Sequence, residues 1–170
     1  PDPEMFELSS PHILEYHEYL PDSAGAGEFR GGLGTRSAWV NYGEHQFGTT
    51  LADNMRSEGA LPAKGLFGGA DSGLNDLTVT FPDGTTHEWG SKEIISLPSG
   101  TRVESLAGGG AGYGFATRRP AETVAAEVRD GILSVEKARD AYGVVVNPQT
   151  FAIDADATAA LRGTQKEAGA

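Results

Sequence analysis

Alternating hydrophobic and polar residues predict β-strands over the first two thirds of the chain. The clearest stretch is 77–81, where Leu77, Val79 and Phe81 share one face and two threonines take the other. Asp83-Gly84 follows this stretch, and such a pair favours a tight turn because glycine reaches positive φ without steric cost. The pattern therefore predicts a hairpin over residues 77–89.

Weaker alternation predicts further strands on both sides of this hairpin. Residues 11–20 are bounded by prolines and are expected to form one strand. Residues 35–42 alternate, and residues 45–51 are expected to be their hairpin partner across Gly43-Glu44. A second unit of strand, turn and strand is predicted over residues 93–106.

From Pro120 onward the hydrophobic period changes to that of a helix. Val124 and Val128 lie four residues apart, Pro120 fits the first helical position, and Gly131 is placed to end the helix. Two more short helices are predicted: one capped by Ser134 that ends at Tyr142-Gly143, and one over residues 154–162 that Gly163 stops.

These elements together predict an α+β fold in three parts. Residues 1–117 are expected to form a β-rich domain of hairpins and glycine-rich loops. Residues 118–163 follow as a short helical C-terminal segment, and residues 164–170 are expected to be a frayed tail.

The glycine content changes this picture. The 170 residues include 24 glycines, about twice the usual share of roughly 7 %. Leu, Ile, Val and Phe together make up only 20 % of the chain, which is little for a self-sufficient core. A chain so rich in glycine and poor in large apolar residues is expected to be a dependent part of something larger.

The glycines gather in three clusters, at residues 24–34, 65–69 and 108–114. The first is expected to be irregular backbone with several positive-φ positions. None of the clusters has the spacing of a phosphate-binding loop or of the dinucleotide fingerprint. The favoured interpretation is tight loops at a subunit or domain contact, because glycine lets one backbone approach another closely.

Charge and cysteine content exclude several classes of function. The chain has 13 Lys and Arg against 24 Asp and Glu, a net charge of −11, so nucleic-acid binding and anionic membrane surfaces are not expected. Cysteine is absent, which removes disulfides and thiol chemistry. With no long apolar segment and no signal peptide, a cytoplasmic location is expected. Seven acids crowd the first 28 residues without any Lys or Arg, and the sequence assigns them no role beyond solubility.

No catalytic residues and no metal site are expected within the chain itself. The four histidines, His12, His17, His45 and His87, lack metal-ligand spacing. Ser134 and Lys137 match an S-x-x-K pattern, but its companion motifs are missing and a helix cap explains the serine better.

Four segments occur in an order that resembles a known family: AGAGEFRGGLG at 24–34, KGLFGG at 64–69, GGGAGYG at 108–114 and VRDGILSVEKARDAYGVVV at 128–146. Together they resemble the C-terminal part of the B subunit of the hydantoinase B/oxoprolinase family. This family includes N-methylhydantoinase, 5-oxoprolinase, caprolactamase, and ATP-dependent acetone and acetophenone carboxylases. The resemblance runs from about residue 6 to residue 146.

The resemblance implies a role inside a hetero-oligomer. In this family an A-type subunit uses ATP with Mg²⁺ to phosphorylate a cyclic amide or a related carbonyl compound, and the B-type subunit acts on the activated intermediate. The divalent metal of the B-type subunit is held in an N-terminal portion that this chain does not contain. The implied partners are therefore the remainder of the B-type subunit and the A-type subunit. The chain is expected to be inactive alone, as a fragment, a split subunit or a proteolytic remnant.

The resemblance also implies which residues contact other subunits or approach the active site. They lie in the matched motifs and are Gly25, Gly27, Arg30, Gly31, Gly32, Gly68, Gly69, Gly108, Gly109, Gly110, Gly112 and Tyr113.

Two alternatives stay open beside the cyclic-amide hydrolase. The chain could be the same part of an ATP-dependent ketone carboxylase. A different class is a stand-alone β-rich binding module that presents Trp39, Tyr42 and Trp89 to a sugar or a peptide.

Overall fold

The computed structural model describes residues 2–50, 55–56 and 59–168, with side chains described up to residue 164. No helix in this part of the chain is long and apolar enough to cross a membrane. The chain folds into two compact units, which are interleaved along the sequence. The sheet unit comprises Pro1–Tyr19, Thr35–Pro62 and Leu74–Gly108, and the glycine–helix unit comprises Leu20–Gly34, Ala63–Gly73 and Gly109–Ala170. The division at residues 117 and 118 stays a prediction.

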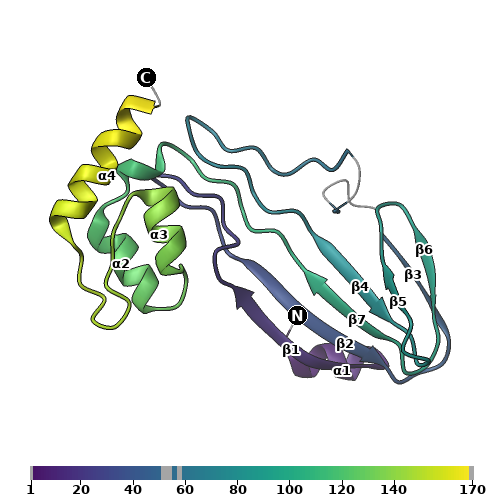
Figure 1. The fold of residues 1–170 in the computed structure, drawn as a ribbon. Helices are drawn as coiled ribbons and strands as arrows, with labels where there is room; N and C mark the ends of the chain where they lie inside the picture. Colours follow the sequence, from purple (N-terminus) through teal and green to yellow (C-terminus); the bar gives the residue numbers. More distant parts are fainter. Residues whose placement is uncertain (1, 51–54, 57–58, 169–170) are drawn as a thin grey trace. The chain divides into compact units, whose positions relative to one another are not determined.

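Within the described residues, seven strands and four α-helices confirm the α+β, β-rich class (Figure 1). The larger sheet of the sheet unit has five strands in the order β1-β2-β7-β4-β5, and β3 pairs with β6 in a separate two-stranded ladder. The strands are β1 (His12–Leu20), β2 (Gly34–Asn41), β3 (Gln46–Thr49), β4 (Asp76–Thr80), β5 (Thr86–Glu88), β6 (Ile94–Leu97) and β7 (Arg102–Leu106).

The hairpin predicted over residues 77–89 is confirmed as β4 and β5. Thr78 lies opposite Glu88 in an antiparallel register, and Gly84 in the turn has a φ of 84°. In the centre of the sheet, Val103 of β7 lies opposite Trp39 of β2 on one side and Val79 of β4 on the other.

The pairing predicted for residues 45–51 is wrong, although the strand itself is present: β3 pairs with β6 instead of returning along β2. The two strands predicted within residues 93–106 are present as β6 and β7, and they belong to different sheets. The buried side chain of Asn41 explains where β2 ends. Its Nδ2 donates to the carbonyl oxygens of Leu97 (2.9 Å) and Glu44 (3.1 Å), and its Oδ1 accepts from the amide of Gly43 (3.0 Å). These bonds give the backbone after β2 partners other than a neighbouring strand.

The core of the sheet unit lies where the five-stranded sheet meets the β3–β6 ladder. A Cβ at Gly48 would collide with the ring of Trp89, so glycine in β3 makes room for this ring. The buried members of the core are Val79, Trp89, Leu97 and Val103, with Trp39, Leu77, Phe81 and Ile95 packed against them.

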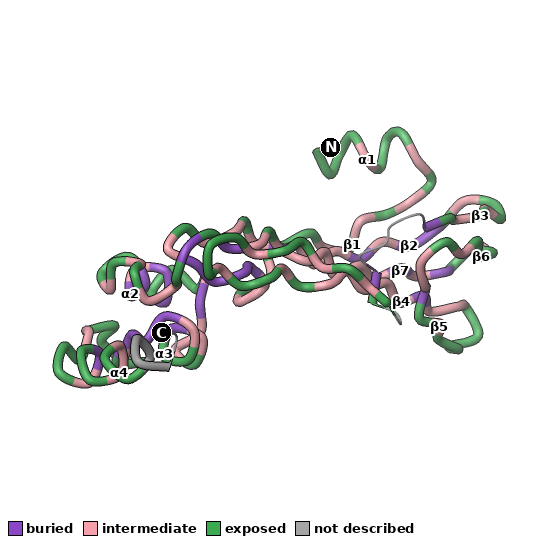
Figure 2. The backbone as a smooth tube through the Cα atoms, turned by 90° about the horizontal axis from the view of Figure 1, so that it is seen from above, coloured by how far each residue is buried: buried purple, intermediate pink, exposed green. Residues whose placement is uncertain are grey.

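A short helix, α1 (Pro3–Ser9), was not expected from the sequence. Its signal is local: Asp2 accepts from the amide of Glu4 (3.0 Å) as the N-cap, and Pro3 occupies the start of the helix. Figure 2 shows no buried residue in α1, in agreement with its exposure. Glu7 of this helix accepts from the amide of Leu14 in β1 (2.9 Å).

The opposite face of the five-stranded sheet carries a charged cluster. Its centre is Glu104 of β7, whose Oε1 accepts from Tyr16 Oη (2.6 Å) and from Arg36 Nε (2.7 Å). Arg102 Nη1 donates to the second oxygen of Glu104 (3.0 Å), and its Nε donates to Glu15 (2.7 Å). The hydrogen bonds from Tyr16, Arg102 and Arg36 lower the pKa of Glu104 to about 2.

The helices of the glycine–helix unit follow the predicted caps closely. The hydroxyl of Ser134 accepts from the amide of Lys137 (3.0 Å), which confirms the cap, and Gly131 and Gly143 end their helices with φ of 72° and 62°. Pro120 stands at the N-cap and not at the first helical position. The elements are the 3₁₀-helix η1 (Ala116–Arg118), α2 (Ala121–Arg129), α3 (Val135–Tyr142) and α4 (Ala155–Ala168).

The sequence predicted that the last helix ends at Gly163, but α4 continues to Ala168. Gly163 is exposed, and a glycine inside an exposed helix costs only about 1 kcal/mol, so it does not force an end. The core of this unit is formed by α2, α3 and the chain after them. Its buried residues are Ala26, Val124, Ala125, Val128, Leu133, Ala138, Tyr142, Val144 and Val146.

Replacing Glu104 tests the charged cluster of the sheet unit. A carboxyl whose folded pKa is depressed contributes stability above its unfolded pKa of about 4.5 and loses it as the pH falls towards 2. We expect Glu104→Gln to lower the free energy of unfolding at pH 7, because the variant lacks the carboxylate to which Tyr16, Arg36 and Arg102 donate. The loss should be only about 1–2 kcal/mol, because water screens the charges of a half-buried cluster. Urea unfolding at pH 7, 5 and 3 measures this, and the variant should lose less stability between pH 5 and 3 than the unchanged chain. An identical pH dependence in both proteins would contradict the assignment.

Candidate functional site

The three glycine clusters lie together in the glycine–helix unit and pair through their backbones. We call residues 24–34, 65–70 and 109–114 the glycine layer. Phe29 and Tyr113 exchange two hydrogen bonds, of 3.0 and 2.9 Å, which join the first segment to the third. Ala70 donates to Ala26 (2.7 Å) and accepts from Gly112 (2.9 Å). Each of the three segments is therefore bonded to both others.

Glycine is required here because the backbones touch. A Cβ on Gly27 would lie 2.6 Å from the amide nitrogen of Tyr113, and one on Gly109 would lie 2.7 Å from the carbonyl oxygen of Gly32. Cβ atoms on Gly31, Gly69 and Gly112 would come even closer to the backbone of Gly110, Gly112 and Ala26, respectively. The glycines therefore allow close approach of one backbone to another within the chain, and their role at a subunit or domain contact stays a prediction.

The expectation of several positive-φ positions in residues 24–34 is wrong. None of these residues has a positive φ, whereas Gly68 (91°) and Gly114 (73°) in the other two segments do. In the first segment glycine serves through its missing Cβ and not through its conformational freedom.

Eleven of the twelve residues proposed from the sequence lie in the glycine–helix unit: Gly25, Gly27, Arg30, Gly31, Gly32, Gly68, Gly69, Gly109, Gly110, Gly112 and Tyr113. The twelfth, Gly108, lies in the sheet unit, where its amide donates to Asn75 Oδ1 (2.8 Å). Gly32 differs from the others because a Cβ there would meet nothing within 4 Å.

An arginine clamp fixes the glycine layer to α2. Arg30 Nε (3.0 Å) and Arg119 Nη2 (2.8 Å) donate to the same oxygen of Glu127 in α2. Arg30 Nη1 also donates to the carbonyl of Gly31 (2.8 Å), and Arg119 Nη1 to that of Glu28 (2.9 Å). The side chains of Arg30, Arg119 and Glu127 are only 17, 14 and 10 % exposed, so this ion pair is largely removed from water.

Tyr142 is near the three charged groups of this clamp and has no solvent exposure. Burial raises the pKa of its hydroxyl, and the nearby carboxylate of Glu127 raises it further. The tyrosine is therefore a neutral member of the core beside the clamp.

The sequence did not single out Arg119 or Glu127 as site residues. A signal was present for Glu127, which falls between Val124 and Val128 on the apolar face of α2. An acid on a buried helix face calls for a buried cationic partner.

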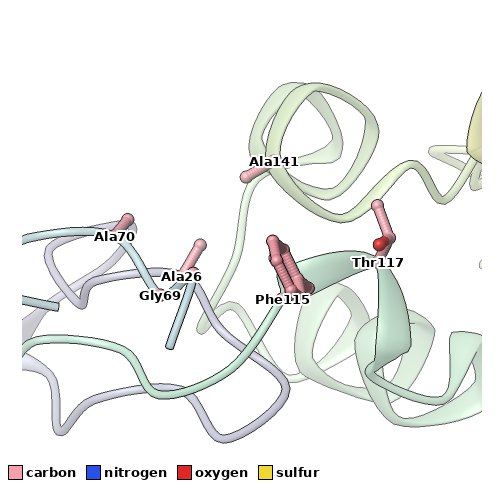
Figure 3. A pocket seen from close by; sticks show the side chains of 8 residues that line it. Ala26, Gly69, Ala70, Phe115, Thr117 and Ala141 are labelled. Carbon is pink, nitrogen blue, oxygen red and sulfur yellow. The ribbon is translucent and has the colours of Figure 1, made fainter. Parts of the chain in front are cut away.

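A pocket of about 320 Å³ opens beside the glycine layer (Figure 3). Ala26, Gly69 and Ala70 come from the layer, Ala141 from α3, and Phe115 and Thr117 from the chain at η1. These walls are small or apolar, so the pocket suits an apolar group better than a charged one.

The four histidines lie in the sheet unit, and three have polar partners there. Nε2 of His12 is 3.0 Å from Gln46 Oε1, that of His45 is 2.6 Å from Ser96 Oγ, and that of His87 is 2.8 Å from Glu93 Oε1. His17 lines a hollow next to Trp39 and Phe6. Among the described residues, no group of three His, Cys, Asp or Glu side chains is placed to hold a metal ion.

The strands β1 to β7 and the three segments of the glycine layer all lie within residues 1–116. Residues 1–116 match the Hydantoinase B/oxoprolinase family, and the chain belongs to this family. This confirms the resemblance found in its motifs.

Two relatives are similar along most of the chain. The caprolactamase subunit beta of Pseudomonas jessenii is 34 % identical over 155 residues, which cover 86 % of this chain and 25 % of the relative. The acetophenone carboxylase delta subunit of Aromatoleum aromaticum is 23 % identical over an alignment of 195 positions, gaps included, which covers 99 % of this chain and 28 % of the relative. The chain thus spans about a quarter of the length of these curated relatives.

Two solved structures share the fold. The ATP-dependent caprolactamase from Pseudomonas jessenii superposes with a TM-score of 0.73 at 32 % identity and covers 95 % of this chain and 28 % of its own. A nucleotide-free acetone carboxylase superposes with a TM-score of 0.77 at 19 % identity and covers 99 % of this chain and 26 % of its own. The helical end beyond residue 116 is therefore part of the shared fold.

Neighbouring glycines provide a matched test of the layer. We expect Gly31→Ala to destabilise the chain by about 3 kcal/mol or more, because its Cβ would collide with the backbone of Gly110. Gly32→Ala should change the free energy of unfolding by less than about 1 kcal/mol, since its Cβ meets open space. Urea unfolding followed by circular dichroism compares the two. Equal effects would show that the glycines are not needed for backbone contact.

Replacing Glu127 tests the arginine clamp. Glu127→Gln leaves two guanidinium groups beside each other without a counter-charge, so we expect a loss of about 2–4 kcal/mol in the free energy of unfolding. The control is Glu136→Gln on the exposed side of α3, which should cost less than about 0.5 kcal/mol. Thermal unfolding of both variants is the measurement, and a Glu127 variant as stable as the control would contradict the role of the clamp.

Proposed function

We propose that the chain serves as the C-terminal part of a B-type subunit in an ATP-dependent cyclic-amide hydrolase of the hydantoinase/oxoprolinase kind. The observation that carries this proposal is the 34 % identity to the beta subunit of caprolactamase, over 86 % of the chain. The glycine layer supports it, since three of the four motifs that resemble B-type subunits form this one layer.

In this proposal the chain contributes subunit contacts and loops beside the active site. The arginine clamp and the glycine layer supply a rigid surface, because backbone bonds join the three segments and the buried Glu127 holds the first of them through Arg30. A preformed surface loses little conformational entropy when a partner binds. The chain alone is expected to be inactive.

The cofactors belong to the partners in the same proposal. An A-type subunit would bind ATP with Mg²⁺ and phosphorylate the substrate, and the remainder of the B-type subunit would hold the divalent metal. The working assembly is a hetero-oligomer of these parts, and the residues of this chain would take no part in holding the nucleotide.

A ketone carboxylase is the second candidate. It is favoured by the similarity to the acetophenone carboxylase delta subunit, which extends over 99 % of the chain. The two candidates differ in whether a ring is opened by water or a carboxyl group is added to a ketone.

Reconstitution tests the proposed function and separates the two candidates. The chain is coexpressed with the remainder of its B-type subunit and the A-type subunit, and ATP hydrolysis is measured with caprolactam, hydantoin or 5-oxoproline, and separately with acetone or acetophenone plus bicarbonate. We expect turnover of a cyclic amide by the assembly and none by the chain alone. Turnover of a ketone in place of an amide supports the second candidate, and cyclic-amide turnover by the isolated chain contradicts the proposal.

Within this assembly, Arg30→Ala should lower assembly or turnover at least 10-fold, because the clamp positions the glycine layer. Arg129→Ala is the matched control, since Arg129 is an exposed residue whose Nε pairs with its sequence neighbour Asp130 (3.0 Å). Size-exclusion profiles and turnover rates of the two variants give the result. Unchanged profiles and rates for the Arg30 variant would reject this role.

A further inference from the structure

The glycine layer presents a group of exposed apolar side chains that its own unit does not cover. We infer that this surface, formed by Phe29, Leu66, Phe67 and Tyr113 and named here the aromatic face, is where the remaining part of a B-type subunit packs onto the chain. The inference rests on the proposed function and names a partner and a surface for it.

The four side chains come from paired backbone segments, since Phe29 and Leu66 both form β-bridges with Tyr113, and the three rings are adjacent. Phe29 is 63 %, Leu66 56 %, Phe67 73 % and Tyr113 48 % exposed. The ring of Tyr113 lies 6.1 Å from that of Phe29 and 5.1 Å from that of Phe67, measured between centroids. Single exposed apolar residues are common on monomers, but adjacent large ones usually mark a surface that another polypeptide covers.

The backbone holds these side chains in place. Phe29 and Tyr113 are joined by their two backbone hydrogen bonds, and Leu66 donates to Gly112 (3.0 Å) and accepts from Gly114 (2.9 Å). The backbone that carries the aromatic face is therefore fixed by bonds within the glycine layer.

Phe67 also has an unusual backbone conformation. Its φ of 52° lies in the left-handed region, which a bulky residue other than glycine rarely adopts. A turn in which Gly69 donates to Leu66 (3.0 Å) holds this conformation. The chain keeps this rare conformation although Phe67 stays 73 % exposed and its ring lies beside that of the neighbouring Tyr113, which fits a residue that a partner covers.

A hollow continues the aromatic face. The pocket of about 320 Å³ is lined by Gly68 and Gly69, the residues directly after Phe67, and by the half-exposed ring of Phe115. A Cβ on Gly68 would lie 2.6 Å from that ring, so glycine keeps the chain close to Phe115. A pocket beside exposed rings is the arrangement that receives an apolar anchor residue from a partner.

The remaining part of a B-type subunit fits this surface better than other partners. In the two solved relatives the matched fold is 26 % and 28 % of one longer polypeptide, so the remainder of that polypeptide is covalently joined to it and is always available as a neighbour. Permanent interfaces resemble a divided core and are apolar, whereas transient ones carry more charge. A second copy of the chain is disfavoured by its net charge of −11.

A second apolar pair, in the sheet unit, offers a contrast. Phe47 and Ile94 are exposed on the β3–β6 ladder, but His45 and Ser96 lie among them and are hydrogen-bonded to each other (2.6 Å). This mixed surface is not the one we assign to the partner, and it provides a control.

The test uses Phe67→Asn. Asparagine is well tolerated at a left-handed φ, so the variant should fold at least as well as the unchanged chain, which thermal unfolding checks. Phe47→Asn on β3 is the control. The chain is coexpressed with the remainder of its B-type subunit, and the dissociation constant of the purified complex is measured by analytical ultracentrifugation, together with self-association and binding to the A-type subunit alone.

We expect Phe67→Asn to weaken binding to the remainder of the B-type subunit at least 10-fold and Phe47→Asn to change it less than 3-fold. Unchanged binding of the Phe67 variant, while the unchanged chain binds and supports turnover, overturns this inference and leaves the proposed function intact. A loss confined to self-association or to the A-type subunit also overturns it. Failure of the unchanged chain to bind the remainder of the B-type subunit contradicts both.

Discussion

The missing Cβ of the glycines is the constraint on which the glycine–helix unit depends. Three segments far apart in the sequence lie so close that a methyl group on Gly25, Gly31, Gly69 or Gly112 would overlap the backbone of a neighbouring segment. Backbone hydrogen bonds replace side-chain packing in this layer, which explains how a chain with only 20 % Leu, Ile, Val and Phe forms an ordered unit. The layer has few interior side chains of its own, so its stability depends on what holds its borders.

Charged groups hold the borders of the glycine layer, so some acidic residues have a structural role that composition alone did not indicate. Glu127 joins Arg30 and Arg119 at one border of the layer, and Asp22 accepts from the amide of Ser134 (2.8 Å) at the start of α3. Among the seven acids of the first 28 residues, Asp22 is thus structural, as are the N-cap Asp2 and the ion-paired Glu15 described above. The net charge of −11 consequently includes acids with fixed positions as well as solvated ones.

Local signals were predictable from the sequence, and non-local pairings were not. The Asp83-Gly84 hairpin and the cap at Ser134 depend on neighbouring residues and are correct. β3 pairs with β6, and Asn41 bonds Leu97 at the end of β6, 56 positions further along the chain, and no periodicity reveals either contact. For the candidate site, too, the local motifs were informative and the contacts between distant residues were not. The motifs identified the glycines, but their contact partners and the role of Glu127 follow from the fold.

Amide hydrogen exchange measures whether the three segments form one rigid layer. The amides of Phe29, Ala70, Gly112 and Tyr113 donate within the layer, so they should exchange as slowly as the amides of α2 at pH 7. If the segments were independent loops, these amides would exchange fast, because the side chains around them are exposed and would not shield them from water. Exchange of these amides at the rate of an unstructured chain, while α2 stays protected, would contradict the account.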